Sequence, residues 1–407
     1  MSKASGSGDG VPAPPPAVAL PVSAVAEAFT PPPYPYARLN DLRRLADTVP
    51  GGLVDLSVGT PCDPVPEVAA RALAEAGPRA AGYPPAAGTP AFLAAACGWM
   101  RRTFGVEVEP SAVLPCIGTK ELVSSLPHLL RLRTPSKDTV LYPAVSYPTY
   151  AMGAQLAGCR AVPVPLDADW HIDLSGVSPS DAERALVLWM NEPANPTGAA
   201  ASPERFEETV AWGQTHAVLV ASDECYAEFT YDTLGRSAAP HTALAASREG
   251  VLALHSLSKR SNLAGLRAGF AAGDPELVAY LRSVRTHAGM MLPGPVQAAA
   301  AAALDDDAHV IVQREIYARR RALVGDWAAA SDRVVSDGGP ASFYLWLRDS
   351  RAEPSGWRLA SEMAEAGTVV SPGELYGERG SGHVRVALVA PIERLSVAVE
   401  RLAARLG

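Results

Sequence analysis

The sequence contains only four lysines, and the neighbours of one of them, Lys259, suit covalent cofactor chemistry. Ser256 and Ser258 precede this lysine, and Arg267 follows it eight residues later. An amine that attacks an aldehyde must be positioned and partly unprotonated, and a phosphate on the same cofactor needs hydroxyl donors and a fixed cation. The serine hydroxyls and the guanidinium can supply these. The pattern therefore predicts a pyridoxal-phosphate site, whereas an exposed lysine in a serine-rich turn is the ordinary alternative.

Two further segments carry groups that could contact a pyridine ring. Asp223 follows the apolar run 217–222, and Tyr226 comes three residues later. A carboxylate at the ring nitrogen keeps that nitrogen protonated, because an opposite charge favours the charged form. The Tyr226 hydroxyl and the Asn195 amide could hydrogen-bond the ring oxygen. A helix N-cap at Asp223 and an ordinary turn at N-P-T-G are the alternatives.

Other candidates lie at the ends of expected strands. Gly118 and Thr119 begin a helix, so the N–H groups of its first turn could receive a phosphate. Lys120 is an alternative Schiff-base lysine, but it lacks the serine and arginine neighbours. Tyr147 could stack on the ring or fill the core. Arg385, in the middle of an alternating strand, could bind an α-carboxylate in bidentate fashion or face solvent.

The pattern around these residues predicts an α/β fold with a mainly parallel sheet and helices on both faces. Helical or loop segments separate seven short apolar runs, which are 112–117, 138–142, 161–165, 185–190, 217–222, 251–256 and 267–272. After Asp274, long helical patterns at 275–288, 294–304 and 308–330 lead to short strands and a closing helix from about residue 391, which predicts a smaller α+β domain.

Four regions follow from this pattern. We expect a flexible tail rich in Pro, Gly and Ala, an N-terminal segment that packs with the small domain, a large cofactor-binding domain and a small C-terminal domain. Their boundaries are 1–30, 31–52, 53–290 and 291–407.

Composition narrows the partners to small molecules. The formal net charge of −8 argues against a nucleic-acid partner, and no apolar run reaches the roughly 18 residues of a membrane span. The five cysteines are scattered and lack paired spacing, so we expect neither a metal site nor a disulfide framework. A reducing cytoplasm fits this pattern.

Together these segments resemble the class I/II pyridoxal-phosphate aminotransferases of fold type I. The resemblance covers the chain from about residue 35 to its end. It rests on the order and spacing of Gly59, Tyr83, Gly118-Thr119-Lys120, Tyr147-Pro148, Asn195-Pro196-Thr197-Gly198, Asp223-x-x-Tyr226, Ser256-x-Ser258-Lys259, Arg267 and Arg385.

The resemblance implies a role for each of these positions. Lys259 would form the Schiff base and act as acid and base, and Asp223 and Tyr226 would complete the catalytic set. The other cofactor-binding residues would be Gly118, Thr119, Lys120, Tyr147, Asn195, Ser256, Ser258 and Arg267. Gly59, Asn195 and Arg385 would bind the amino acid and 2-oxo acid substrates. Tyr83 would reach the phosphate of a neighbouring subunit, which implies a homodimer.

Within this family, segments such as VDLSVGTPCDP, HSLSKRSNLAGLRAGF and HVRVALV look most like actinobacterial succinyldiaminopimelate aminotransferases of lysine biosynthesis. That likeness implies N-succinyl-2-amino-6-oxopimelate as acceptor and glutamate as donor. Glu192, the stretch before Phe343 and the N-terminal tail depart from the expected pattern. The alternative is a specialised-metabolism paralogue that uses the same site on another amino acid, including for lyase or carbon–carbon bond-forming chemistry. A non-catalytic regulator on the same fold is an alternative from another class, but the sequence has no appended helix-turn-helix.

Overall fold

The computed structural model describes residues 29, 30, 32, 35–232 and 234–407. The predicted flexible tail, residues 1–30, therefore lies almost entirely outside the described residues. The N-terminal segment contains the helix α1 (Leu39–Asp47), which follows a short 3-10 turn. Leu42 and Ala46 of α1 are buried, whereas Arg44 on its other side is exposed.

The central sheet has seven strands in the order β2-β8-β7-β6-β5-β3-β4. Their bounds are β2 (Val113–Cys116), β3 (Thr139–Pro143), β4 (Arg160–Val164), β5 (Ala185–Asn191), β6 (Leu219–Asp223), β7 (Val251–Ser256) and β8 (Gly269–Gly273). In this sheet β8 runs opposite to the other six strands, so its pairs with β2 and β7 are antiparallel and the remaining pairs are parallel. The predicted mainly parallel sheet is confirmed, and each observed boundary lies within two residues of its expected position. Every residue of β5 and β7 is buried, which explains their continuous apolar runs.

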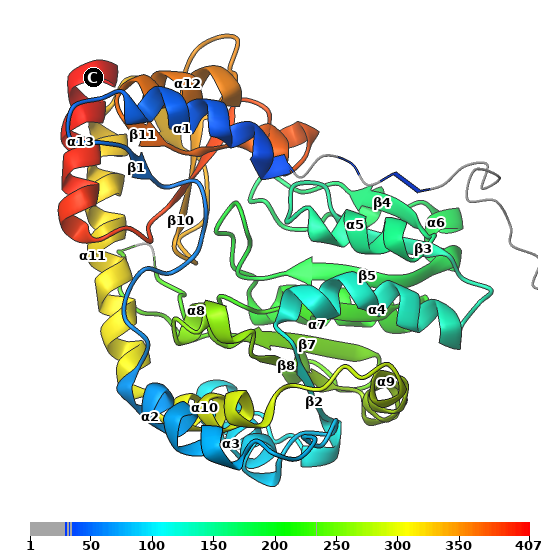
Figure 1. Cartoon of the computed structure of the whole chain (residues 1–407). Coiled ribbons are helices and arrows are strands. Elements are labelled where there is room, and N and C mark those ends of the chain that lie inside the picture. The colour runs from blue at the N-terminus through cyan, green and yellow to red at the C-terminus, as the bar shows by residue number, and fades with distance from the viewer. Residues whose placement is uncertain (1–28, 31, 33–34, 233) are drawn as a thin grey trace, which may run out of the picture.

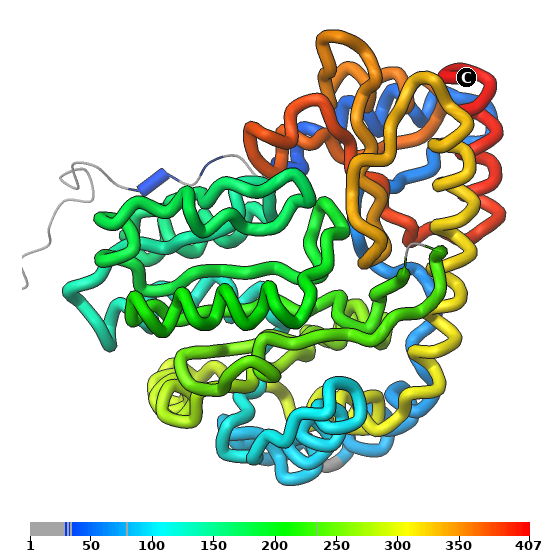
Figure 2. Tube along the Cα trace, turned by 180° about the vertical axis from the view of Figure 1, so that it is seen from behind, coloured from blue at the N-terminus to red at the C-terminus, as the bar shows by residue number. Residues whose placement is uncertain are grey.

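Helices cover both faces of this sheet (Figures 1 and 2). Trp189 of β5 packs into a core with helices on one face, and Leu188 beside it packs into the core of the opposite face. The helices of the first face are α4 (Thr119–Arg133), α5 (Thr149–Leu156) and α9 (Pro275–His287). Those of the second are α3 (Pro90–Phe104), α7 (Pro203–Thr215) and α10 (Gly294–Asp305), while α2 (Glu67–Ala76) packs against α10. The α/β fold of type I is therefore confirmed.

Local signals set the ends of these helices. Thr89 caps α3 by accepting a hydrogen bond from the Phe92 N–H, Pro90 occupies the first turn, and Gly105 ends the helix in a left-handed conformation. Ser202 caps α7 in the same way, again with a proline in the first turn. The N-caps set where α3 and α7 begin, and Gly105 sets where α3 ends.

A second sheet lies at the other end of the long helix α11 (Ala308–Ala330), which Figure 1 shows extending from the α2–α10 pair to the C-terminal helix α13 (Ile392–Leu406). The strand order is β12-β13-β10-β9, and all pairs are antiparallel. The bounds are β9 (Val334–Ser336), β10 (Tyr344–Asp349), β12 (Ser371–Pro372) and β13 (His383–Ala387). The same part of the chain contains the helix α12 (Gly356–Glu365) and the strand β11 (Thr368–Val369), which pairs in parallel with β1 (Val54–Asp55). The sequence did not predict α12 or β11.

The boundaries expected at 52/53 and 290/291 stay predictions. Two contacts cross the boundary at 290/291. β1 pairs with β11, and α10 packs against α2 and α3 beside the central sheet. Among the described residues, no helix is both long enough and apolar enough to cross a bilayer.

Candidate active site

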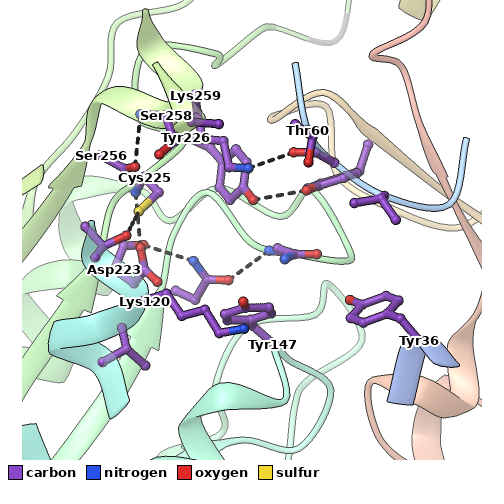
Figure 3. Close-up of a pocket in the computed structure, with 18 of the residues that line it drawn as sticks. Tyr36, Thr60, Lys120, Tyr147, Asp223, Cys225, Tyr226, Ser256, Ser258 and Lys259 are labelled. Atoms are coloured by element: carbon purple, nitrogen blue, oxygen red, sulfur yellow. Dashed lines mark hydrogen bonds between the residues drawn. The ribbon is translucent and has the colours of Figure 1, made fainter. Parts of the chain in front are cut away.

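A cavity of about 530 Å³ opens at the carboxyl ends of β5, β6 and β7, where ligands bind in open α/β sheets. The N-terminal segment around α1 and the strand β13 close its other side. Twelve of the fourteen predicted site residues line it, namely Gly59, Thr119, Lys120, Tyr147, Asn195, Asp223, Tyr226, Ser256, Ser258, Lys259, Arg267 and Arg385. Figure 3 shows how those that it labels converge from separate elements, namely Lys120, Tyr147, Asp223, Tyr226, Ser256, Ser258 and Lys259.

Lys259 lies in the short helix α8 (Leu257–Arg260), directly after β7. Its Nζ donates a hydrogen bond of 2.7 Å to the carbonyl of Gly59. Burial, together with the positive charges of Arg385 and Arg267, lowers the pKa of the Lys259 amine from 10.5 to about 8. About a tenth of this amine is therefore unprotonated at pH 7, and the unprotonated form is the one that acts as a nucleophile.

Asp223 is the last residue of β6, and its side chain is buried at the floor of the cavity. The hydroxyl of Tyr150 donates to Oδ2 at 2.8 Å, and the N–H of Cys225 donates to Oδ1 at 3.3 Å. Burial raises the pKa of the Asp223 carboxyl, and these two donors oppose that rise. A cationic ring nitrogen at this carboxylate would recover the free energy that its burial costs.

The start of α4 and the segment around Lys259 form an anion-binding corner. Gly118 has a φ of +74°, and a Cβ at this position would come within 2.4 Å of Arg267 Nη2, so only glycine fits. The side chains of Thr119, Ser256 and Ser258 line the same cavity and offer hydroxyl groups. The first-turn N–H groups of a helix attract anions as well.

Arg385 lies in β13 and is 2 % exposed. Its Nη1 donates to Asn195 Oδ1 at 2.7 Å, and its Nη2 donates to the carbonyl of Ser57 at 2.6 Å. The ring centroid of Tyr344 lies 4.2 Å from its Cζ. Because both Nη atoms are anchored to neutral acceptors, the guanidinium is held in place while its charge is left for a ligand.

Three tyrosines, Tyr147, Tyr226 and Tyr344, and one further lysine also line the cavity. The Tyr226 hydroxyl lies 3.1 Å from that of Tyr344. Tyr147 follows β3 and is half-buried, and the Nζ of Lys120 lies 5.7 Å from its ring centroid. The close-up shows Lys120 and Tyr147 side by side below Asp223 (Figure 3).

The sequence between residues 52 and 402 matches the family model of class I and II aminotransferases. The chain belongs to this family. The aminotransferase OxyQ of Streptomyces rimosus, named 4-dedimethylamino-4-oxo-anhydrotetracycline transaminase, is 44 % identical over 91 % of this chain and 99 % of its own. The probable aminotransferase Rv1178 of Mycobacterium tuberculosis is 45 % identical over 91 % of this chain and 85 % of its own.

Solved structures give the same assignment. An aminotransferase from Neisseria meningitidis superposes with a TM-score of 0.84 at 29 % identity, covering 92 % of this chain and 98 % of its own. A probable N-succinyldiaminopimelate aminotransferase from Thermus thermophilus superposes with a TM-score of 0.82 at 31 % identity, covering 92 % and 100 %. This aminotransferase, like the others of its family, depends on pyridoxal phosphate.

The cavity of this aminotransferase fits that cofactor. Its volume lies within the range of small-molecule sites. The corner formed by Thr119, Ser256, Ser258 and Arg267 offers donors to a phosphate, Asp223 offers a carboxylate to a pyridinium, and Lys259 offers an amine to an aldehyde. The three groups lie on one continuous cavity wall, as binding a single small molecule requires.

Two predicted site residues do not line the cavity. Gly118 lies behind Arg267, which does. Tyr83 is 96 % exposed, so its predicted contact with a neighbouring subunit stays a prediction. Glu192, which departs from the expected pattern, also lies outside the cavity, where its Oε1 pairs with His171 Nδ1 at 3.0 Å.

Sequence reasoning missed several residues of the site. Asn191 lines the cavity, donates through Nδ2 to the Asp223 carbonyl at 2.9 Å and accepts the Asn195 N–H at 2.8 Å. It thus joins the ends of two strands. Tyr150, which bonds Asp223, follows the predicted Tyr147 by three residues, and that helical spacing was an available signal. Arg43 and Tyr344 come from distant segments, and no local pattern marks them.

Proposed function

We propose that this aminotransferase moves the amino group of glutamate to N-succinyl-2-amino-6-oxopimelate, a reaction of diaminopimelate and lysine biosynthesis. The observation that carries this proposal is the charge of the cavity. Among the described residues, a single carboxylate lines the cavity, that of Asp223. The basic side chains that line it are Arg43, Lys120, Lys259, Arg267 and Arg385. A phosphate and one α-carboxylate leave positive charge for a substrate that carries a second carboxylate. Both proposed substrates carry one.

The proposed roles follow from the contacts. Bound pyridoxal phosphate supplies an aldehyde that accepts the amino group and a ring that withdraws electrons. Arg385 binds the α-carboxylate through its anchored guanidinium, and the Asn195 amide, held by Arg385, presents its Nδ2 to the ring oxygen. Lys259 removes the proton from the substrate α-carbon, since its pKa near 8 leaves it basic and partly unprotonated. Asp223 keeps the ring nitrogen protonated.

Two kinds of relative support this proposal. One is named for diaminopimelate and the other for its N-succinyl derivative. LL-diaminopimelate aminotransferase of Desulforudis audaxviator is 35 % identical over 92 % of this chain. The name of the Thermus structure contains N-succinyldiaminopimelate, which is the product that forms when the proposed acceptor is aminated. The 44 % identity with OxyQ instead favours a second candidate, amination of a ketone on a larger specialised metabolite. We also propose a cytoplasmic homodimer, in which the exposed Tyr83 reaches the cavity of the partner.

A screen of half-reactions tests this function. The purified enzyme with bound cofactor is mixed with single amino donors, and the loss of its visible absorption band is followed while the products are identified by mass spectrometry. We expect glutamate to discharge the band and yield 2-oxoglutarate, and N-succinyl-2-amino-6-oxopimelate to restore it. Restoration only by a polycyclic ketone would favour the second candidate, and decarboxylated or cleaved products would contradict transamination.

A further inference from the structure

Arg43 of α1 lines the active-site cavity although it comes from the N-terminal segment. Three acceptors hold it in one orientation. Its Nε donates to Asp55 Oδ2 at 2.8 Å, its Nη2 donates to Ser57 Oγ at 3.1 Å, and its Nη1 donates to Asn40 Oδ1 at 3.1 Å. The side chain remains 29 % exposed, so part of the guanidinium is open to a ligand.

Ser57 links this arginine to the proposed carboxylate clamp. The Ser57 hydroxyl accepts from Arg43 Nη2, and the Ser57 carbonyl accepts from Arg385 Nη2. One buried residue therefore fixes both guanidinium groups on the same wall of the cavity. Asp55 in turn fixes Ser57, because its Oδ1 accepts both the N–H and the hydroxyl of that residue.

The cavity wall also contains apolar side-chain surface next to Ser57 in the sequence. Val58, beside Ser57, is 42 % exposed and lines the cavity. Tyr36 lies on the same side, and its hydroxyl donates to that of Tyr376 at 3.1 Å, which turns its polar end toward the C-terminal sheet. A ligand that spans Arg385 and Arg43 would thus place charged ends on two fixed cations and methylene groups along Val58.

We propose that Arg43 binds the side-chain carboxylate of the substrate and makes the enzyme selective for amino acids and 2-oxo acids that carry a second carboxylate. This inference rests on the proposed function, in which Arg385 binds the α-carboxylate. The Asp55 carboxylate offsets part of the positive charge of Arg43, but it engages the Nε edge and leaves the Nη groups to meet a ligand. The Nη groups keep N–H donors that can meet a carboxylate.

The test compares glutamate with glutamine, which has the same shape and no side-chain charge, in wild type, Arg43→Met and Arg43→Lys. We expect Arg43→Met to lower the catalytic efficiency kcat/KM for glutamate by about 10- to 100-fold, because a hydrogen bond to a charged group is lost. The value for glutamine should change by less than about threefold, and Arg43→Lys should recover part of the glutamate value. An equal loss for both donors, or no loss for either, would overturn the proposal.

Arg44→Met is the matched control, because Arg44 is the next residue of the same helix, has a side chain that is 76 % exposed and forms an ion pair with Asp41 at the surface. It should leave the preference for glutamate unchanged. A second measurement needs no turnover: calorimetric titration of the enzyme with glutarate, which has two carboxylates, and with pentanoate, which has one. Arg43→Met should weaken glutarate binding by about 10-fold or more and leave pentanoate binding unchanged. If wild type rejects glutamate as donor, the proposed reaction fails, while glutarate binding still decides the role of Arg43.

Discussion

Replacement of Lys259 by methionine should stabilise the cofactor-free protein at neutral pH. Below pH 8 the lysine is protonated in both the folded and the unfolded chain, and the folded state carries the full cost of its buried charge. Between pH 8 and pH 10.5 the unfolded chain binds more protons than the folded chain, so the stability of wild type rises with pH. Above pH 10.5 the amine is neutral in both states and the cost is gone. Methionine has a similar length and no charge, so it removes this cost.

The magnitude follows from the pKa of Lys259. The fall from 10.5 to about 8 corresponds to about 3 kcal/mol, at 1.36 kcal/mol for each pKa unit. The variant also loses the bond of 2.7 Å to the Gly59 carbonyl, which costs about 1 kcal/mol. The net gain should be about 2 kcal/mol at pH 7, and it should shrink to about zero by pH 9.5, where most of the charge cost has disappeared.

Urea unfolding of both cofactor-free proteins at one protein concentration, at pH 7 and at pH 9.5, measures this difference. Lys137→Met is the matched control, because its Nζ also donates to a main-chain carbonyl, that of Ala217, at 2.7 Å, but from a side chain that is only partly buried. Desolvation lowers the pKa of Lys137 as well, so the control should show the same direction of change and a smaller gain than Lys259→Met. A Lys259→Met variant that is less stable than wild type at pH 7, or whose difference does not change with pH, would refute a buried and destabilising amine.

Two other substitutions test the ring and phosphate sites. Tyr150→Phe removes the hydroxyl that donates to Asp223, so the pKa of this carboxyl should rise further, and the acid limb of the pH profile of kcat/KM should move to higher pH; an unmoved limb would contradict the role of Asp223. Gly118→Ala should weaken cofactor binding by at least about 10-fold in a fluorescence titration, because its Cβ would displace Arg267 and strain a φ of +74°. Gly105→Ala is the control, since its φ is +70° and no atom lies within 4 Å of its Cβ; equal effects from both variants would show backbone strain alone.

The sequence predicted most of the sheet and most of the cavity, for one physical reason. Parallel strands end at the same edge, so residues just after apolar runs, such as Asp223 and Lys259, must meet there. The order of Ser256, Lys259 and Arg267 then identified the chemistry. The two-residue strand β11 and the helix α12 were missed, because short pairings and helices between loops leave little periodic signal.

The residues that the sequence did not reveal act through long-range contacts. Arg43 reaches the cavity because Asp55 and Ser57 hold it there, and Asn191 acts by joining Asp223 to Asn195. Neither role follows from residue type or spacing, since it depends on how α1 and the two strand ends pack. Side-chain networks of this kind become visible only once tertiary structure is known.

Lys259 should carry the cofactor of this aminotransferase. Reduction of the enzyme with borohydride fixes the cofactor on its lysine, and peptide mass spectrometry then locates it. We expect the pyridoxyl group on Lys259 and on none of the other three lysines. A pyridoxyl group on Lys120, or none on any lysine of an enzyme that is active with glutamate, would contradict it.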